Sequence, residues 1–135
     1  MFVGLDLHKN YLQTAVMDEQ GRLLSQERIP NRDECIEEFA SKRLRDLHAE
    51  VVIESSSTWY HVYELLSKNQ NWHTILSNPV KTKAIASAKV KTDNVDALTL
   101  ANLLRGGYIP ESYVPPKHIM DLRMMVRYRA SLVKM

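Results

Sequence analysis

The chain has 135 residues, of which 44% are hydrophobic and 25% are charged, and its formal net charge is +2. This length suits one globular domain that buries roughly two thirds of its unfolded surface. No apolar run approaches the ~20 residues of a membrane span, and the N-terminus lacks the pattern of a signal peptide. We therefore expect a cytoplasmic protein without a membrane role, and the single cysteine excludes an internal disulfide.

Apolar periodicity predicts three strands at the start of the chain, over residues 2–8, 10–18 and 21–29. A tight turn around Glu19-Gln20-Gly21 joins the last two, so we expect an antiparallel β-meander. Asn31 is the expected N-cap of a following helix, which precedes a strand at 50–54. The apolar side of this helix is expected to contain Cys35, Ile36, Phe39, Leu44 and Leu47.

Ser57 or Thr58 is the expected cap of a second helix, which runs to about Asn69 and precedes a short strand at 72–76. Its inward side chains are expected to be Tyr60, Tyr63, Leu65 and Leu66. Residues 79–105 are expected to be helical with a break near 89–92, and Gly106-Gly107 ends them. A proline-rich linker at 110–116 then leads to a last helix at 117–135.

The predicted order is βββαβαβ followed by helices. Three antiparallel strands continued by right-handed β-α-β crossovers form a mixed five-stranded α/β sheet with helices on both faces. This is the ribonuclease H-like arrangement, in which the first strand lies beside the fourth.

Four acids lie where neighbouring residues are apolar. Asp6 interrupts a predicted strand and Glu54 ends another, and a lone charge is costly in a buried strand. Asp93 and Asp96 open an apolar helix at a spacing of three, which directs both carboxylates to one side. Together the four predict a magnesium site that acts on phosphodiester bonds.

Each acid also has a structural interpretation. Asp93 is a suitable N-cap, and Asp96 would then be favourable in the first helical turn because of the helix dipole. Single acids at strand ends are usually structural.

The basic residues favour a phosphate partner, although an isolated basic run is more often a solvated helix face. They form two clusters, one of Lys81, Lys83, Lys89 and Lys91, the other of Lys117, Arg123, Arg127, Arg129 and Lys134.

Four segments carry a family resemblance: Gly4-Leu5-Asp6-Leu7-His8-Lys9, Glu54-Ser55-Ser56-Ser57, Asn78-Pro79, and Lys91-Thr92-Asp93-Asn94-Val95-Asp96-Ala97. In this order and spacing they resemble the successive motifs of the DEDD-type insertion-sequence transposases. That family includes pilin-gene inverting recombinases and bridge-RNA-guided recombinases. The resemblance spans almost the whole chain.

The resemblance implies a RuvC-like catalytic domain over residues 1–109 that cleaves DNA and transfers strands during transposition. It implies that Asp6, Glu54, Asp93 and Asp96 bind Mg²⁺, with Mn²⁺ as a substitute. DNA is the expected partner, and a guide RNA is a further candidate. The nucleic-acid-binding residues are expected to be Lys9, Lys81, Lys83, Lys89, Lys91, Arg123 and Arg127. His8 could contact phosphate as well, but a histidine at a strand end is explained equally well by a local hydrogen bond.

The chain departs from the family pattern at its end. Full-length members resemble two domains joined by a helix, and the second domain carries a serine nucleophile, whereas this chain stops at Met135. Residues 117–135 resemble the start of the linking helix, so we expect a catalytically incomplete fragment. Ile119, Leu122, Val126 and Val133 recur at helical spacing, which favours a homo-oligomer through this helix.

Three alternatives stay open. The first is a module that holds guide RNA or DNA without catalysis. The second is a nuclease similar to Holliday-junction resolvases, and the third is an ATPase of the sugar-kinase and actin type. The last is the weakest, because its phosphate loop needs glycine and residues 7–14 contain none.

Overall fold

The computed structural model describes residues 1–43, 48–54, 56, 58–89 and 95–134. Its elements follow the predicted order βββαβαβ and then helices, with bounds close to those expected. They are β1 (Phe2–Leu7), β2 (Tyr11–Met17), β3 (Leu23–Pro30), α1 (Asp33–Arg43), β4 (Ala49–Glu54), α2 (Trp59–Ser67), β5 (Trp72–Ser77), α3 (Pro79–Lys89), α4 (Ala97–Gly106) and α5 (Lys117–Lys134).

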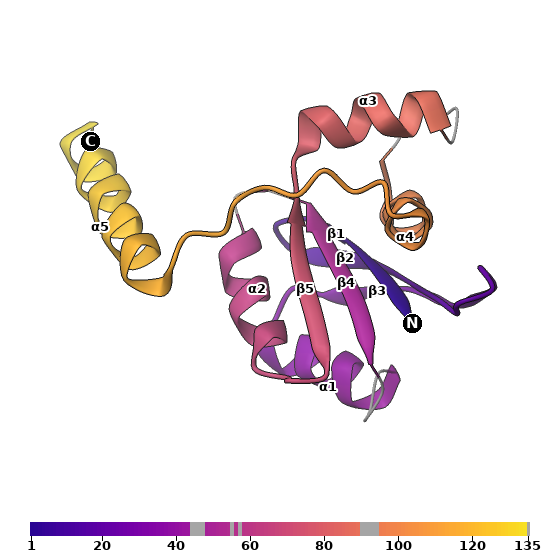
Figure 1. Ribbon diagram of the computed structural model, residues 1–135. Helices are drawn as coiled ribbons and strands as arrows, with labels where there is room; N and C mark the ends of the chain where they lie inside the picture. Colours follow the sequence, from indigo (N-terminus) through magenta and orange to yellow (C-terminus); the bar gives the residue numbers. More distant parts are fainter. Residues whose placement is uncertain (44–47, 55, 57, 90–94, 135) are drawn as a thin grey trace.

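The five strands form one sheet in the order β3-β2-β1-β4-β5 (Figure 1). Strand β1 pairs antiparallel with β2 and parallel with β4, β2 pairs antiparallel with β3, and β4 pairs parallel with β5. The meander and the two crossovers are therefore confirmed. So is the predicted fold class, a mixed ribonuclease H-like α/β sheet flanked by helices.

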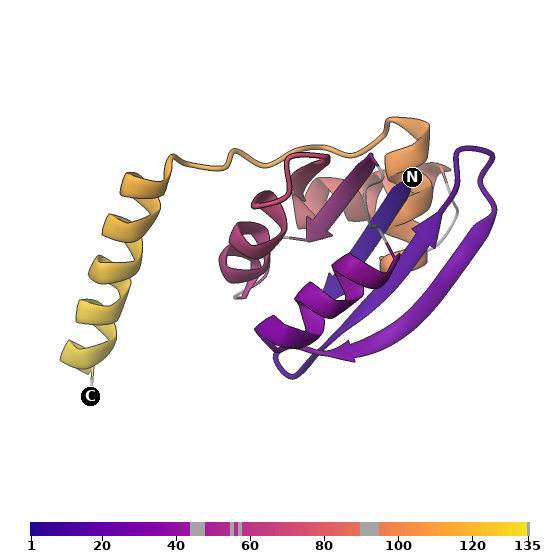
Figure 2. The same cartoon turned by 90° about the horizontal axis from the view of Figure 1, so that it is seen from below.

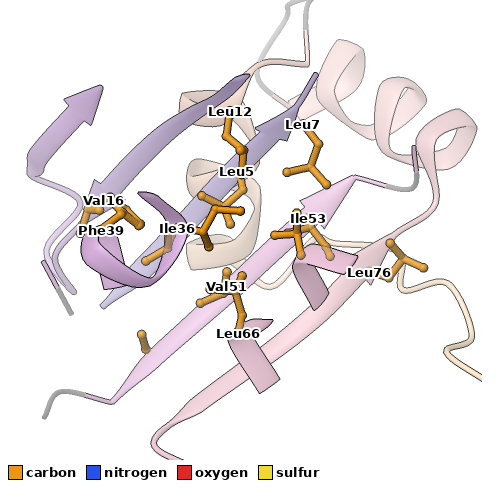
Figure 3. Packing of buried hydrophobic residues seen from close by; sticks show 13 residues of the cluster. Leu5, Leu7, Leu12, Val16, Ile36, Phe39, Val51, Ile53, Leu66 and Leu76 are labelled. Carbon is orange, nitrogen blue, oxygen red and sulfur yellow. The ribbon is translucent and has the colours of Figure 1, made fainter. Parts of the chain in front are cut away.

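One face of the sheet packs against α1 and α2 and forms the main hydrophobic core (Figure 3). Leu5 and Ile53 from the central strands meet Ile36 of α1 and Leu66 of α2 in this cluster. The inward side of α2 differs from the prediction in part. Val62 and Leu66 are its buried residues, whereas the predicted Tyr60, Tyr63 and Leu65 are half-buried. The helical period places residues 62 and 66 over the sheet, and Tyr63 and Leu65 pack against the edge of the same core.

The opposite face of the sheet is covered by α4, which lies across β1, β2 and β4. Contact between helix and strand is unusually close at Gly4. A Cβ atom added there would lie 2.1 Å from the backbone oxygen of Ala97 and 2.8 Å from the backbone nitrogen of Ala101. Because backbone atoms cannot swing aside as side chains do, only glycine fits at this position.

The predicted cap of α1 is wrong, and the predicted cap of α2 is right in position only. Helix α1 begins at Asp33, and the Asn31 side chain instead donates a hydrogen bond to the His8 carbonyl at 2.9 Å, which ties β3 to the β1–β2 turn. Thr58 occupies the N-cap position of α2, but its side chain makes no capping hydrogen bond. Three other predicted features lie outside the described residues, namely Leu44, Leu47 and Ser57.

The segment after α4 follows the edge of the sheet before it reaches α5. Gly107, with φ of 76°, ends α4 as predicted. The Asn78 amide then donates to the Pro110 carbonyl at 2.8 Å, and the Ser112 amide donates to the Leu76 carbonyl at 2.7 Å, so this segment flanks the end of β5.

Helix α5 stands apart from the sheet at the end of an extended connection (Figures 1 and 2). Met120 in its first turn is buried, and residues 121–134 are exposed. In the described part of the chain, no helix combines the length and apolar character needed to cross a membrane.

Substituting Gly4 by alanine is expected to separate α4 from the sheet. Overpacking against rigid atoms costs about 1–3 kcal/mol or more, so we expect a clear loss of stability in urea unfolding. Gly106→Ala is the matched control, because its added Cβ would meet only the Tyr108 side chain. A Gly4→Ala variant as stable as Gly106→Ala would contradict this account.

Candidate metal site at the carboxyl ends of the strands

Asp6 and Glu54 lie side by side at the carboxyl ends of β1 and β4. The two strands pair in parallel with Leu5 opposite Ile53, and the next residues along them are the two acids. Side chains alternate along a strand, so Asp6 shares the face of Gly4, against which α4 packs. Neighbouring strands are ~4.8 Å apart, which brings the carboxylates to adjacent positions.

The Asp6 charge acts on the neighbouring Glu54 carboxyl. Partial burial raises the pKa of Glu54, the Asp6 charge raises it further, and His8 acts in the opposite direction. The His8 Nε2 atom lies 3.2 Å from Asp6 Oδ2, so His8 has the local hydrogen bond that its structural interpretation requires. The pair of acids is therefore a site where negative charge is concentrated and poorly solvated, which favours a cation.

Asp96 approaches the same face of the sheet through α4. It is the N-cap of this helix, and its Oδ1 atom accepts a hydrogen bond from the Thr99 amide at 2.9 Å. The interpretation that Asp93 caps the helix and Asp96 lies in its first turn is therefore wrong, because the helix begins at Ala97. Asp96 satisfies a free amide of the first turn and still has a second carboxylate oxygen.

Two other candidate site residues of the segment Lys91–Ala97, namely Lys91 and Asp93, lie outside the described residues. Among the residues that are described, no group of three or more His, Cys, Asp or Glu side chains is arranged to hold a metal ion. Convergence of all four acids therefore stays a prediction. The structure places two of them side by side and the third on the same face of the sheet.

A pocket of about 340 Å³ opens beside Glu54 and includes one of the predicted basic residues. It is lined by Glu54, Pro79, Val80, Lys83 and Val95. Lys83 is exposed on α3, and Val95 directly precedes Asp96. Helix α3 thus brings a lysine to the acidic end of β4, where a phosphate group beside the carboxylates would meet a positive charge.

The remaining predicted basic residues are spread over the molecule. Lys9 is exposed at the β1–β2 turn, directly after His8, and Lys81 is exposed on α3. The Lys89 Nζ atom lies 5.1 Å from the centre of the Tyr108 ring, a cation–π contact. Arg123 and Arg127 lie on α5, which stands away from the sheet (Figure 1).

Comparison with known proteins shows which family this chain belongs to. Residues 3–135 match the family model of the IS110-type DEDD transposases, described as a transposase. A transposase for insertion sequence element IS1533 from Leptospira borgpetersenii is 30% identical over 135 residues, which cover 98% of this chain and 39% of the relative. The chain belongs to the DEDD transposase family, as its motifs predicted. It spans well under half the length of this curated relative.

Replacing Glu54 by glutamine is expected to stabilise the fold at neutral pH without divalent cations. With the pKa of Glu54 raised above 4.5, ionising this carboxyl costs more in the folded state than in the unfolded state. Wild-type stability should therefore fall as pH rises above that value, and the advantage of Gln should vanish below it. After allowance for partial solvent exposure, a rise in Tm of about 1–3 °C is expected.

Thermal unfolding between pH 4 and pH 7 in EDTA measures this effect. Glu38→Gln, at an exposed position of α1, is the control and should leave the melting temperature unchanged. An equal response of the two variants across this pH range would show that Glu54 is not destabilised by its surroundings.

Substitutions at Asp96 separate its capping role from its charge. Asp96→Ala is expected to destabilise the fold by about 1 kcal/mol, since the Thr99 amide loses its acceptor. Asp96→Asn should retain nearly full stability because asparagine caps as well as aspartate. Urea unfolding checks both, and an asparagine variant as unstable as the alanine variant would argue against the capping role.

Proposed function

We propose that this chain provides the metal-binding carboxylates of a DNA transposase active site, for cleavage and strand transfer at phosphodiester bonds. The observation that supports it best is the adjacency of Asp6 and Glu54 at the carboxyl ends of two parallel strands. Family membership supports the same assignment, since the relative is itself a transposase for an insertion sequence. Asp96 and Asp93 are the proposed remaining ligands.

The donor set fits Mg²⁺ or Mn²⁺. Both are hard cations that prefer carboxylate oxygens, and the pKa of Glu54 is raised because burial and the Asp6 charge disfavour its ionised form. When bound, such an ion would polarise a phosphoryl oxygen and help a nucleophile to form. In our proposal Asp6 and Glu54 hold it from the sheet, and Asp96 holds it from α4 with the oxygen atom that Thr99 leaves free.

Lys83 and Lys9 are proposed to position the phosphodiester backbone. Lys83 lines the pocket beside Glu54, and Lys9 directly follows the His8–Asp6 contact. Lysine binds phosphate as a compact point charge, so these side chains would offset the repulsion between a phosphate and the carboxylates. Lys81, Lys89 and Lys91 of the same basic segment are proposed to extend this contact along DNA or a guide RNA.

Helix α5 is proposed to mediate self-association in the transposase. Its exposed apolar side chains include Leu122, Met125, Val126, Leu132 and Val133, which are between 50% and 79% exposed. Large apolar side chains on one helix are stabilised when a partner covers them. In the oligomer, Arg123 and Arg127 on the same helix remain candidates for nucleic-acid contact.

Calorimetric titration of the chain with Mn²⁺ and Mg²⁺, with and without DNA, tests the metal site. Asp6→Asn and Glu54→Gln are each expected to lower the affinity about 10-fold or more, because each removes an anionic oxygen ligand. Asp96→Asn should also bind more weakly while it keeps its stability. Glu38→Gln serves as the matched control.

Equal metal affinity in the wild type and the Asp6 and Glu54 variants would refute the proposed site. The second candidate function, a nucleic-acid-binding module without catalysis, is favoured by the lysines of α3. It predicts salt-dependent RNA or DNA binding that survives loss of all four acids, together with no detectable metal binding.

A further inference from the structure

The face of the sheet that bears Asp6 continues past α4 onto β2 and β3. Asp6 pairs with Gln13 of β2, and Gln13 pairs with Arg28 of β3, so the three residues form one cross-strand row on this face. In the next cross-strand row on this face, Tyr11 at the start of β2 pairs with Pro30 at the end of β3. Arg28 and Pro30 are exposed. A polar surface therefore leads from the candidate metal site toward the β3 edge.

Three side chains pack together on this surface, one from the β1–β2 turn, one from β2 and one from β3. The rings of His8 and Tyr11 stack with centroids 4.5 Å apart and an angle of 17° between their planes. The guanidinium carbon of Arg28 lies 4.2 Å from the centre of the Tyr11 ring. His8 in turn contacts Asp6. The aromatic ring thus holds an arginine in a defined place beside the acidic site, because a guanidinium group is attracted to the face of a tyrosine.

Arg28 is exposed, so a ligand can reach its guanidinium nitrogens. Among the described residues, no carboxylate forms an ion pair with it, whereas Arg22 at the other end of the same hairpin is paired with Asp18 at 3.1 Å. Arg105 is similarly engaged, since its Nε atom donates to the Glu19 carbonyl at 3.1 Å. The planar guanidinium group of such an exposed, oriented arginine can donate two parallel hydrogen bonds to two oxygens of a phosphate.

We propose that Arg28, oriented by Tyr11, is a phosphate-binding subsite for the DNA strand whose phosphodiester bond lies at Asp6 and Glu54. This inference rests on the proposed function. Arg28 is two strands from Asp6, which is on the order of 10 Å and corresponds to about three nucleotides at ~3.4 Å each along the axis of a duplex. With Lys83 on the β4 side and Arg28 on the β3 side, positive groups flank the carboxylates along a path across the strands.

The charge distribution supports a strand rather than an isolated phosphate. Asp6 and Glu54 repel a phosphate unless a cation lies between them, so the backbone on either side needs favourable contacts of its own. Arg28 supplies such a contact without a metal ion. Tyr11 is a positioning residue in this proposal, since it acts on the strand through the arginine.

Equilibrium binding of a fluorescent single-stranded DNA oligonucleotide to the chain in EDTA tests the subsite. Arg28→Gln is expected to weaken binding about 3- to 10-fold and to reduce the slope of log K against log salt by about 0.7, the value for one lost phosphate contact. Arg22→Gln removes the same charge at the other end of the hairpin and should change neither quantity. Equal effects of the two substitutions would overturn the proposal.

Tyr11 variants test how the arginine is positioned. Tyr11→Phe retains the ring and should bind as the wild type does, whereas Tyr11→Leu should lose about as much affinity as Arg28→Gln. The double variant Tyr11→Leu/Arg28→Gln should be no weaker than either single variant, since both remove one contact. Additive losses, or a phenylalanine variant as weak as the leucine variant, would overturn the role of Tyr11. Thermal unfolding confirms that each variant is folded.

Repeating the measurement with an RNA oligonucleotide of the same sequence shows whether the subsite binds the backbone of DNA or only that of RNA. A loss of affinity with DNA supports the proposal, and a loss confined to RNA overturns it. Because binding is measured in EDTA, the result is independent of the metal site. If Arg28→Gln weakens DNA binding as expected but the chain does not bind Mn²⁺, the proposed function is refuted and the subsite is not. If the chain binds Mn²⁺ but Arg28→Gln leaves DNA binding unchanged, the subsite is refuted and the proposed function is not.

Discussion

The close contact between Gly4 and α4 is the constraint on which the candidate site depends. A side chain at this position would meet the backbone of Ala97 and Ala101, so the helix can lie directly on β1 only because residue 4 is glycine. The same contact brings Asp96, the residue before the helix, to the face that bears Asp6 and Glu54. Packing at one small residue thus places the helix-borne carboxylate on the same face of the sheet as the strand-borne pair.

This arrangement concentrates like charges where solvent is partly excluded, which is unfavourable for the bare fold. Burial and the Asp6 charge both raise the pKa of Glu54, and His8 offsets only part of this effect. Sites that bind cations or act on phosphates commonly show such local destabilisation, because the ligand later neutralises the charge. Lys83 and Arg28 lie on either side of the acids and carry the opposite charge, as a polyanionic substrate would require.

Much of the fold was predictable from local patterns. Strand and helix order follow from apolar periodicity, and Gly107 ends α4 because its positive φ suits glycine. Errors arose where tertiary contacts compete with local preference. Asn31 bonds to His8 instead of capping α1, and α2 fully buries Val62, which was not predicted, while Tyr63 packs against the core only in part. Asp96 was predicted in the first helical turn but caps the helix, since a cap is decided by where the backbone leaves helical geometry.

By itself the sequence determined the strand order, the four candidate acids and, through their motifs, the transposase family. It did so because periodicity, turn residues and motif spacing are properties of consecutive residues. Only the tertiary structure decided that Asp6 and Glu54 are neighbours in register, that Lys83 shares a pocket with Glu54, and that Arg28 lies over Tyr11. Those relations depend on pairing between distant strands, and a shift of one residue in register would send each side chain to the opposite face.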